Sequence, residues 1–344
     1  MEGVDKDHAF HYPVTPSRVK TWFFLCRPWS VTATFVPALF VLGLVGRDPL
    51  FSWGRWCLAL AAAIPLQIAC NLLNTWGDDR SGVDAVEGAI VTTPQLRDGL
   101  VTSRQVFLAA TGCLAAVCAL GLPLLFFRRD GALSLNWSMA TAAAIGFLGA
   151  TNYATGFKFK YRGLGVPFVF FLMGSIECFG FYAASIPRLL PPPDLLPAYG
   201  KMALARACGA FLLLTLPINC LVAVIMHGND MRDIATDKAA GIRTTASLLG
   251  PRGALVTYGI LHLVPPLFCL TMCAVCLADE YRPPALPWLI PLLVLPLTAR
   301  TLVRAIRVYR TNPANPPWRG LERASGGIHC LFGILYALAL SLGA

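Results

Sequence analysis

The side chains best suited to chemistry in this chain are carboxylates and amides that recur at helical spacing. Asn71, Asn74 and Asp78 are spaced i, i+3 and i+7, so they share one face of a helix, and Asp84 follows shortly after them. Carboxylate and amide oxygens suit a hard cation, and Mg²⁺ usually binds through one or two carboxylates together with the phosphates of a substrate. The segment therefore predicts a magnesium site near the C-terminal end of a helix.

A second segment has the same character. Asn229, Asp233 and Asp237 are spaced i, i+4 and i+8, which again predicts a single helical stripe. Both stripes are expected at the C-terminal ends of their helices, where the helix macrodipole disfavours carboxylates and where neighbouring carboxylates repel one another. Positive charge should therefore offset both stripes.

Five basic residues lie near the two stripes in the sequence and could grip a diphosphate through charge-assisted hydrogen bonds: Lys158, Lys160, Arg232, Lys238 and Arg243. With an apolar helix bundle beneath, this combination predicts a lipid diphosphate held through Mg²⁺ at the membrane surface. Solvated interfacial loops with helix caps are one alternative. An ion-coupled transporter is another, but it would place ionisable residues near the bilayer midplane, where this chain has almost none besides Glu177.

The segments that must position these residues are long and apolar. The chain has 344 residues, of which 56% are hydrophobic and 13% are Asp, Glu, Lys or Arg, about half of the roughly 25% typical of a soluble domain. This composition excludes an ordinary cytosolic enzyme and a disordered protein. A membrane span needs roughly 20 mostly apolar residues, and nine segments qualify: residues 22–46, 53–77, 104–127, 135–156, 164–187, 203–227, 252–278, 285–306 and 325–343.

We therefore expect an all-α membrane protein with nine transmembrane helices in one domain, residues 22–344, after a cytosolic N-terminal segment, residues 1–21. Of the 28 Lys and Arg residues, 20 fall on the side of the N-terminus and of the loops after the second, fourth, sixth and eighth segments. The positive-inside rule places that side, which carries both acidic stripes, in the cytosol. The net charge of +10 indicates contact with the anionic lipid bilayer and not with nucleic acid.

Four sequence patterns surround these residues: N-x-x-x-D with G-x-D at Asn74–Asp84, N-x-M-R-D-x-x-x-D-x-x-x-G-x-x-T at Asn229–Thr244, Y-x-x-G…Y-x-G-L-G at Tyr153–Gly165, and the pair Arg27-Pro28. In these patterns, and over roughly residues 20–340, the chain resembles the UbiA superfamily of intramembrane prenyltransferases. Within that superfamily it most closely resembles the 1,4-dihydroxy-2-naphthoate polyprenyltransferases of menaquinone synthesis. Ser81 stands where the family usually has Lys.

The resemblance implies nine transmembrane helices around a central cavity that opens to the cytosolic side and to lipid. It also implies Mg²⁺ ions that join a prenyl diphosphate to five residues, of which the four aspartates would be catalytic: Asn74, Asp78, Asp84, Asp233 and Asp237. The allylic cation formed as diphosphate leaves would alkylate an electron-rich aromatic acceptor. That acceptor would be 1,4-dihydroxy-2-naphthoate or, as alternatives, 4-hydroxybenzoate or homogentisate.

The acceptor side departs from the family pattern at one position. The family usually has Asp or Glu directly after G-L-G, where this chain has Val166. Glu177 lies eleven residues on, about three helical turns away and on a similar face, so it could substitute for the missing carboxylate. Tyr153 and Tyr161 could line the acceptor site, with an interfacial aromatic belt as the alternative explanation.

Overall fold

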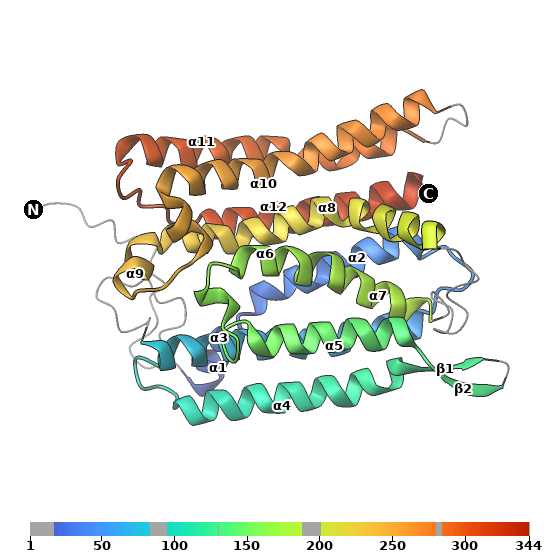
Figure 1. Cartoon of the computed structure of the whole chain (residues 1–344), viewed down its shortest axis with the longest axis horizontal. Helices are drawn as coiled ribbons and strands as arrows, with labels where there is room; N and C mark the ends of the chain where they lie inside the picture. Colours follow the sequence, from blue (N-terminus) through green and yellow to red (C-terminus); the bar gives the residue numbers. More distant parts are fainter. Residues whose placement is uncertain (1–16, 83–94, 130, 188–200, 280–283, 344) are drawn as a thin grey trace, which may run out of the picture.

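The computed structural model describes residues 17–82, 95–129, 131–187, 201–279 and 284–343, and these form a helical bundle with one short hairpin (Figure 1). The α-helices are α1 Arg18–Cys26, α2 Thr32–Val45, α3 Trp53–Ser81, α4 Ser103–Gly121, α5 Trp137–Asn152, α6 Gly165–Val169, α7 Glu177–Ser185, α8 Lys201–Arg232, α9 Ile234–Ala239, α10 Thr245–Ala278, α11 Leu295–Thr311 and α12 Leu321–Gly343. Short 3₁₀ segments are η1 Pro28–Val31, η3 Leu122–Leu125, η4 Phe159–Tyr161 and η7 Leu286–Val294. A π-helix spans Phe170–Ile176, and strands β1 Phe126–Arg129 and β2 Ala132–Leu135 pair antiparallel.

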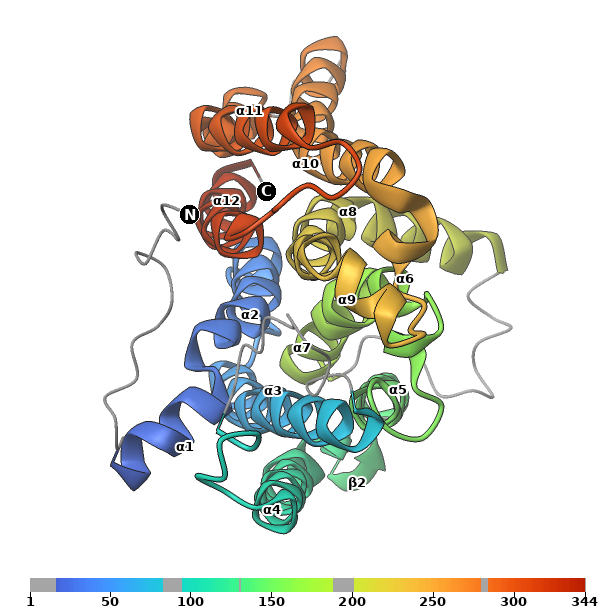
Figure 2. The same ribbon diagram turned by 90° about the vertical axis from the view of Figure 1, so that its left-hand side faces the viewer.

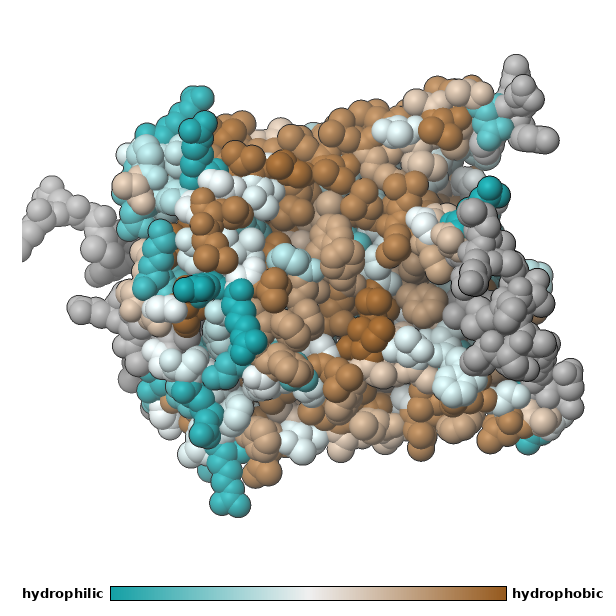
Figure 3. Space-filling model, in the orientation of Figure 1, coloured by the Kyte–Doolittle hydropathy of each residue, from teal (hydrophilic) through white to brown (hydrophobic). Residues whose placement is uncertain are grey.

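Each of the nine predicted segments contains a helix. Within the described ranges, eight helical stretches are long and apolar enough to cross a membrane. The segment predicted at 135–156 is the exception, because α5 has only 16 residues, but it lies alongside the longer helices of the bundle (Figure 1). On the face shown in Figure 3, apolar side chains form a broad band across the middle of the molecule, and hydrophilic ones gather at the end that carries α9. The chain is an integral, multi-pass membrane protein.

The first predicted segment, residues 22–46, is two helices instead of one. α1 begins at Arg18 and leaves the axis of α2 at the pair Arg27-Pro28 (Figure 2). Proline removes a backbone donor and obstructs the preceding turn, and Arg27 adopts a left-handed conformation with φ of 49°. The Ser17 side chain caps the start of α1, so the predicted boundary after residue 21 falls inside a helix.

The helices leave space for a cavity between α2, α3, α4, α5 and α7. At the end of the molecule away from α9, Arg55 of α3 ties three chain segments together through its guanidinium. It donates to the carbonyls of Ala184, Phe126 and Leu124 at 2.8, 2.8 and 2.6 Å. Because these carbonyls end α7, begin β1 and lie in η3, one charged side chain closes the bundle beneath the cavity.

On the other side of the bundle, α2 packs closely against α12 at Gly43. A Cβ atom at Gly43 would lie 2.3 Å from the backbone oxygen of Ala337.

We expect Gly43→Ala to reduce the free energy of unfolding by about 1–3 kcal/mol, because the α12 backbone must move. Thermal unfolding in detergent measures this. Gly112→Ala, in α4 with open space around it, is the matched control and should be neutral or stabilising. Equal destabilisation by both variants would contradict the prediction.

Candidate active site

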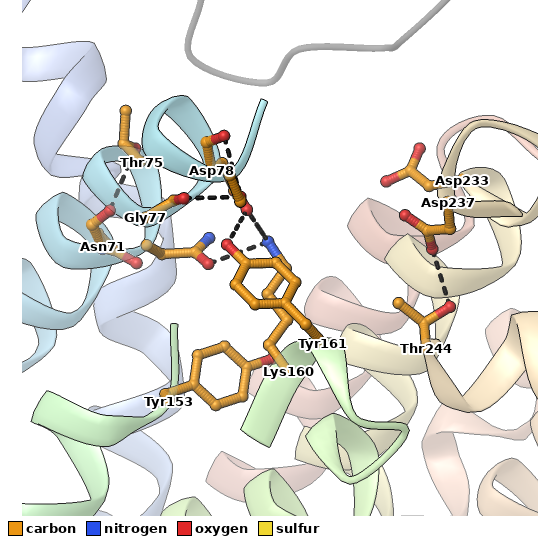
Figure 4. A network of polar contacts seen from close by, with 12 residues as sticks. Asn71, Thr75, Gly77, Asp78, Tyr153, Lys160, Tyr161, Asp233, Asp237 and Thr244 are labelled. Carbon is orange, nitrogen blue, oxygen red and sulfur yellow. Dashed lines mark hydrogen bonds and ion pairs between the residues drawn. The ribbon is translucent and has the colours of Figure 1, made fainter. Parts of the chain in front are cut away.

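The first acidic cluster lies in the last turns of α3 and is paired with a lysine. The ammonium of Lys160 contacts both carboxylate oxygens of Asp78, at 2.7 and 2.8 Å, and the side-chain oxygen of Asn74 at 3.0 Å (Figure 4). The Tyr161 hydroxyl donates to the same carboxylate at 2.7 Å. Three oxygens therefore already surround one positive charge at this position.

The turn between α5 and α6 brings Lys160 to Asp78. A left-handed residue, Lys158 with φ of 55°, reverses the chain, and the Lys160 backbone N–H donates to the Tyr153 carbonyl at 3.0 Å. Gly77 lets α3 approach this turn, since a Cβ there would lie 2.7 Å from the Ala154 carbonyl oxygen. The close approach of two backbones thus fixes the position of the ion pair.

Asn71 serves a different purpose from Asn74, although the two share a helix face. Its side-chain nitrogen donates to the Cys26 carbonyl at 3.0 Å and to the Ser30 hydroxyl at 2.7 Å. It therefore attaches the α1–η1 joint to α3. Asn71 also forms part of the cavity wall, which is where its predicted contact with a substrate would have to be made.

The second cluster is divided between two helices, so the predicted single stripe is wrong in detail. α8 ends at Arg232, and Asp233, with φ of −100° and ψ of 8°, separates it from α9. Helical hydrogen bonds nonetheless continue, from the Asp233 N–H to the Asn229 carbonyl at 3.1 Å and from the Asp237 N–H to the Asp233 carbonyl at 2.8 Å. Asp237 consequently lies in the first turn of α9, where the helix dipole favours a carboxylate.

Each aspartate of the second cluster has a donor. The Arg232 guanidinium binds Asp233 through two hydrogen bonds of 2.7 and 2.5 Å and contacts Asn229 at 3.3 Å. On its other side it lies 3.6 Å from Glu322 of α12. The Thr244 hydroxyl donates to Asp237 at 2.8 Å. Arg232 is therefore held between two helices, and its side chain is only 9% exposed.

The two clusters face one another at the same end of the bundle (Figure 4). Burial raises the pKa of Asp237 to about 6, and the carboxylates of Asp233 and Asp78 act in the same direction. The Thr244 hydrogen bond and the Lys160 ammonium act against this rise in pKa. Asp237 therefore senses charges on both clusters, which means that α3 and α9 border one polar space.

Several predicted residues are exposed or lie outside the described chain, so their part in binding the substrate stays a prediction. Lys158, Lys238 and Arg243 are exposed. Asp84 falls in the stretch 83–94, beyond the described residues. Among the residues that are described, no three His, Cys, Asp or Glu side chains are close enough together to hold a metal ion. The magnesium site thus stays a prediction, supported by the oxygen donors of Asn74 and Asp78 and by the lysine ammonium that stands among them.

Sequence reasoning did not select two further residues beside the site. Asp230 is buried at 7% exposure and interacts electrostatically with Asp237 and Lys160. Arg27 donates to the Thr75 hydroxyl at 3.3 Å and lines the cavity. The Arg-Pro pair could have indicated Arg27, and Asp230 could have been selected from its i, i+3 and i+7 spacing with Asp233 and Asp237.

A cavity of about 450 Å³ extends from the polar space into the bundle. Asn74 and Tyr153 border its polar end, and the Tyr153 hydroxyl contacts the Met226 sulfur at 3.1 Å. Glu177 also lines this cavity, but Val166, which is buried, is not part of the wall. The expected common face of these two residues is therefore wrong, because the π-helix Phe170–Ile176 lies between them and has more residues per turn than an α-helix.

The Thr244 hydroxyl makes two hydrogen bonds that stabilise the fold. Substitution by valine or by serine separates the effect of losing these bonds from the effect of side-chain size. The hydroxyl donates to Asp237 and accepts the Ser247 N–H at 3.3 Å, which caps α10. We expect Thr244→Val to lower the free energy of unfolding by about 1–2 kcal/mol, because both the cap and the hydrogen bond to a buried carboxylate are lost. Thr244→Ser keeps the hydroxyl and should unfold within a few degrees of the parent in a thermal scan. A Val variant as stable as the Ser variant would contradict the prediction.

Comparison with known proteins identifies the family. Residues 34–326 match the model of the UbiA prenyltransferase family. UbiA prenyltransferase domain-containing protein 1 of Mus musculus is 28% identical over 92% of this chain and 82% of its own length. The Drosophila melanogaster homolog is 27% identical over 94% of this chain and 79% of its own. These relatives are named for the family and not for a naphthoate acceptor.

Solved structures agree on the fold. A UbiA homolog from Archaeoglobus fulgidus bound to GPP and Mg²⁺ superposes with a TM-score of 0.58 at 16% identity, covering 93% of this chain and 99% of that one. The apo structure of a UbiA homolog from Aeropyrum pernix K1 also gives 0.58, at 17% identity and covering 88% and 96% of the two chains. This chain therefore belongs to the UbiA prenyltransferase family and is a multi-pass membrane prenyltransferase.

Proposed function

We propose that this protein transfers a polyprenyl group from a prenyl diphosphate to 1,4-dihydroxy-2-naphthoate, with Mg²⁺ as cofactor. The observation that carries the proposal is the meeting of two acidic clusters around Lys160 at the head of an apolar cavity. A diphosphate is polyanionic, so it needs cations between itself and these carboxylates. The A. fulgidus homolog of the same fold has been seen with GPP and Mg²⁺.

The proposed metal ligands are the oxygen-bearing residues of both clusters: Asn74, Asp78, Asp84, Asp233 and Asp237. The donor set fits a hard cation, since the Lys160 ammonium already takes three of these oxygens as partners. Mg²⁺ would supply charge that stabilises the leaving diphosphate more in the transition state than in the ground state.

The chain's own residues would do the rest of the work. Lys160 is positioned to bind diphosphate oxygens once its contacts with Asp78 are exchanged, and Tyr161 would keep that carboxylate oriented. The C–O bond to diphosphate breaks with its electron pair leaving on diphosphate, and the allylic carbon bonds to the ring carbon that bears the carboxylate. That carbon then loses the carboxylate as carbon dioxide, and the electron pair of the broken C–C bond restores the aromatic ring. The apolar cavity walls exclude water, which limits hydrolysis of the allylic cation.

We also propose that the site opens to the cytosol. The acidic clusters lie at the end where hydrophilic side chains gather (Figure 3). In the sequence, 20 of 28 basic residues fall on that side, and basic loops stay cytosolic by the positive-inside rule.

Asp78→Asn and Asp233→Asn test the paired clusters. Each variant removes one negative charge from a different cluster, and we expect magnesium-dependent prenyl transfer to fall at least about 100-fold in each. Release of diphosphate by purified protein measures this. Asp48→Asn, in the exposed loop after α2, is the matched charge-removal control and should keep full activity. Turnover retained in both site variants would contradict the proposed site.

A panel of aromatic acceptors tests the proposed substrate. Purified protein with Mg²⁺ and a labelled prenyl diphosphate should convert 1,4-dihydroxy-2-naphthoate to a prenylated product that has lost the carboxyl group, as judged by its mass. Product formed only from 4-hydroxybenzoate or only from homogentisate would overturn the naphthoate proposal. It would leave the proposed diphosphate site standing.

A further inference from the structure

The cavity wall contributed by α3 changes character along the helix. Toward the acidic clusters it is formed by Gln67, Cys70, Asn71 and Asn74, and farther away by small and apolar residues of the range 59–66. At a rise of 1.5 Å per residue, the polar and apolar stretches each extend about 10 Å along the helix. The cavity thus has a polar half next to the diphosphate site and an apolar half beyond it.

Glu177 belongs to the polar half. It begins α7 and lines the same cavity as Thr34 of α2. Its charge acts on Cys70, which lies one helical turn from Asn74 on α3. Glu177 and Cys70 line the same cavity. Of the described residues in the cavity wall, Glu177 is the one acid.

The backbone before Glu177 is specially arranged. The π-helix Phe170–Ile176 ends directly at this residue, and π-turns occur mostly at functional positions. Asn219 of α8 donates to the Ser175 hydroxyl at 2.7 Å, and Ser175 contacts Thr215 at 2.7 Å. A Cβ on Gly174 would lie 2.0 Å from the Asn219 side-chain oxygen. This buried polar network supports the turn that directs Glu177 to the cavity.

The chemistry of the substrates decides what Glu177 could bind. A carboxyl group inside a membrane span is costly unless a polar partner satisfies it. A prenyl chain has no donor, and a diphosphate carries the same sign of charge as a carboxylate. A ring hydroxyl of an aromatic acceptor is the donor that remains, and the polar half of the cavity, next to the diphosphate site, would place the ring near the reacting carbon.

We propose that Glu177, together with Thr34, binds a ring hydroxyl of the aromatic acceptor and so selects and orients that substrate. This inference rests on the proposed prenyl transfer to an aromatic ring. Glu177 acts here as a substrate-binding residue that distinguishes a hydroxylated ring from one whose oxygen is methylated. A site built to bind a hydroxyl rejects an analogue without it, because the buried polar group is then left without a partner.

Steady-state kinetics on Glu177→Leu, Glu177→Gln and Thr34→Val test the proposal. For Glu177→Leu we expect the KM of the acceptor to rise about 10- to 100-fold, the usual size of a hydrogen bond to a charged group. Glu177→Gln should show a smaller rise because its amide oxygen still accepts a hydrogen bond, and Thr34→Val should be intermediate. The KM of the prenyl diphosphate should stay unchanged in all three. Leu267→Met, an apolar exchange at an exposed position of α10 outside the cavity wall, is the matched control and should leave both KM values unchanged.

An acceptor with its ring hydroxyl methylated provides a second readout. The parent protein should prefer the hydroxylated ring, and Glu177→Leu should lose most of that preference. The unfolding temperature of each variant shows that the fold is intact. The inference would be overturned if Glu177→Leu left both the acceptor KM and the preference for the hydroxylated ring unchanged. It would also be overturned if the only effect of Glu177→Leu were tighter binding of the prenyl diphosphate. Failure of the parent protein to prenylate any aromatic ring, with diphosphate binding intact, would contradict the proposed function instead.

Discussion

The ion pair between Lys160 and Asp78 is the contact on which the polar end of the molecule depends. Both side chains are largely buried, at 19% and 11% exposure, so their charges are poorly screened by water. Asp230, Asp233 and Asp237 add further negative charge nearby. Lys160 contacts Asp78 directly and acts electrostatically on Asp237, so its charge offsets repulsion between the carboxylates of α3 and α9.

This charge balance also explains why the arrangement suits a divalent cation. The four described acids at the site outnumber the two cations, Lys160 and Arg232, that contact them. Arg232 is already bound on one side to Asp233 and on the other to Glu322. Burial already raises the pKa of Asp237 to about 6, so negative charge that is not neutralised is costly at this position. A divalent metal bound to the substrate phosphates would neutralise this charge at the mouth of the apolar cavity. A lipid diphosphate must place its charged head at that mouth and its hydrocarbon chain inside the cavity.

The sequence predicted what depends on periodicity. The apolar runs located the eight membrane-length helical stretches of the described residues and also α5, and the 3.6-residue period put Asn74 and Asp78 on the face that meets Lys160. It could not tell Lys160 from Lys158, because the difference arises from one left-handed residue in a turn. Nor could it foresee the break at Asp233, since near-helical hydrogen bonding continues through it. These features depend on contacts between segments distant in the sequence.

The direction of the Glu177 side chain is a clearer example of a feature that the sequence could not predict. Uniform α-helical geometry would place it on the face of Val166, but seven residues of π-helix intervene and change the direction in which it points. That turn is maintained by Asn219 and Thr215 of α8, residues that local sequence gives no reason to connect with it. A carboxyl group in the middle of a span would fit an ion pathway if other ionisable groups continued it. Beyond Glu177 the described cavity wall is apolar, so proton or ion transfer along it has no next partner. An apolar wall suits a hydrocarbon chain that lies beyond a single polar contact, here Glu177. Prenyl transfer to a hydroxylated ring requires this arrangement.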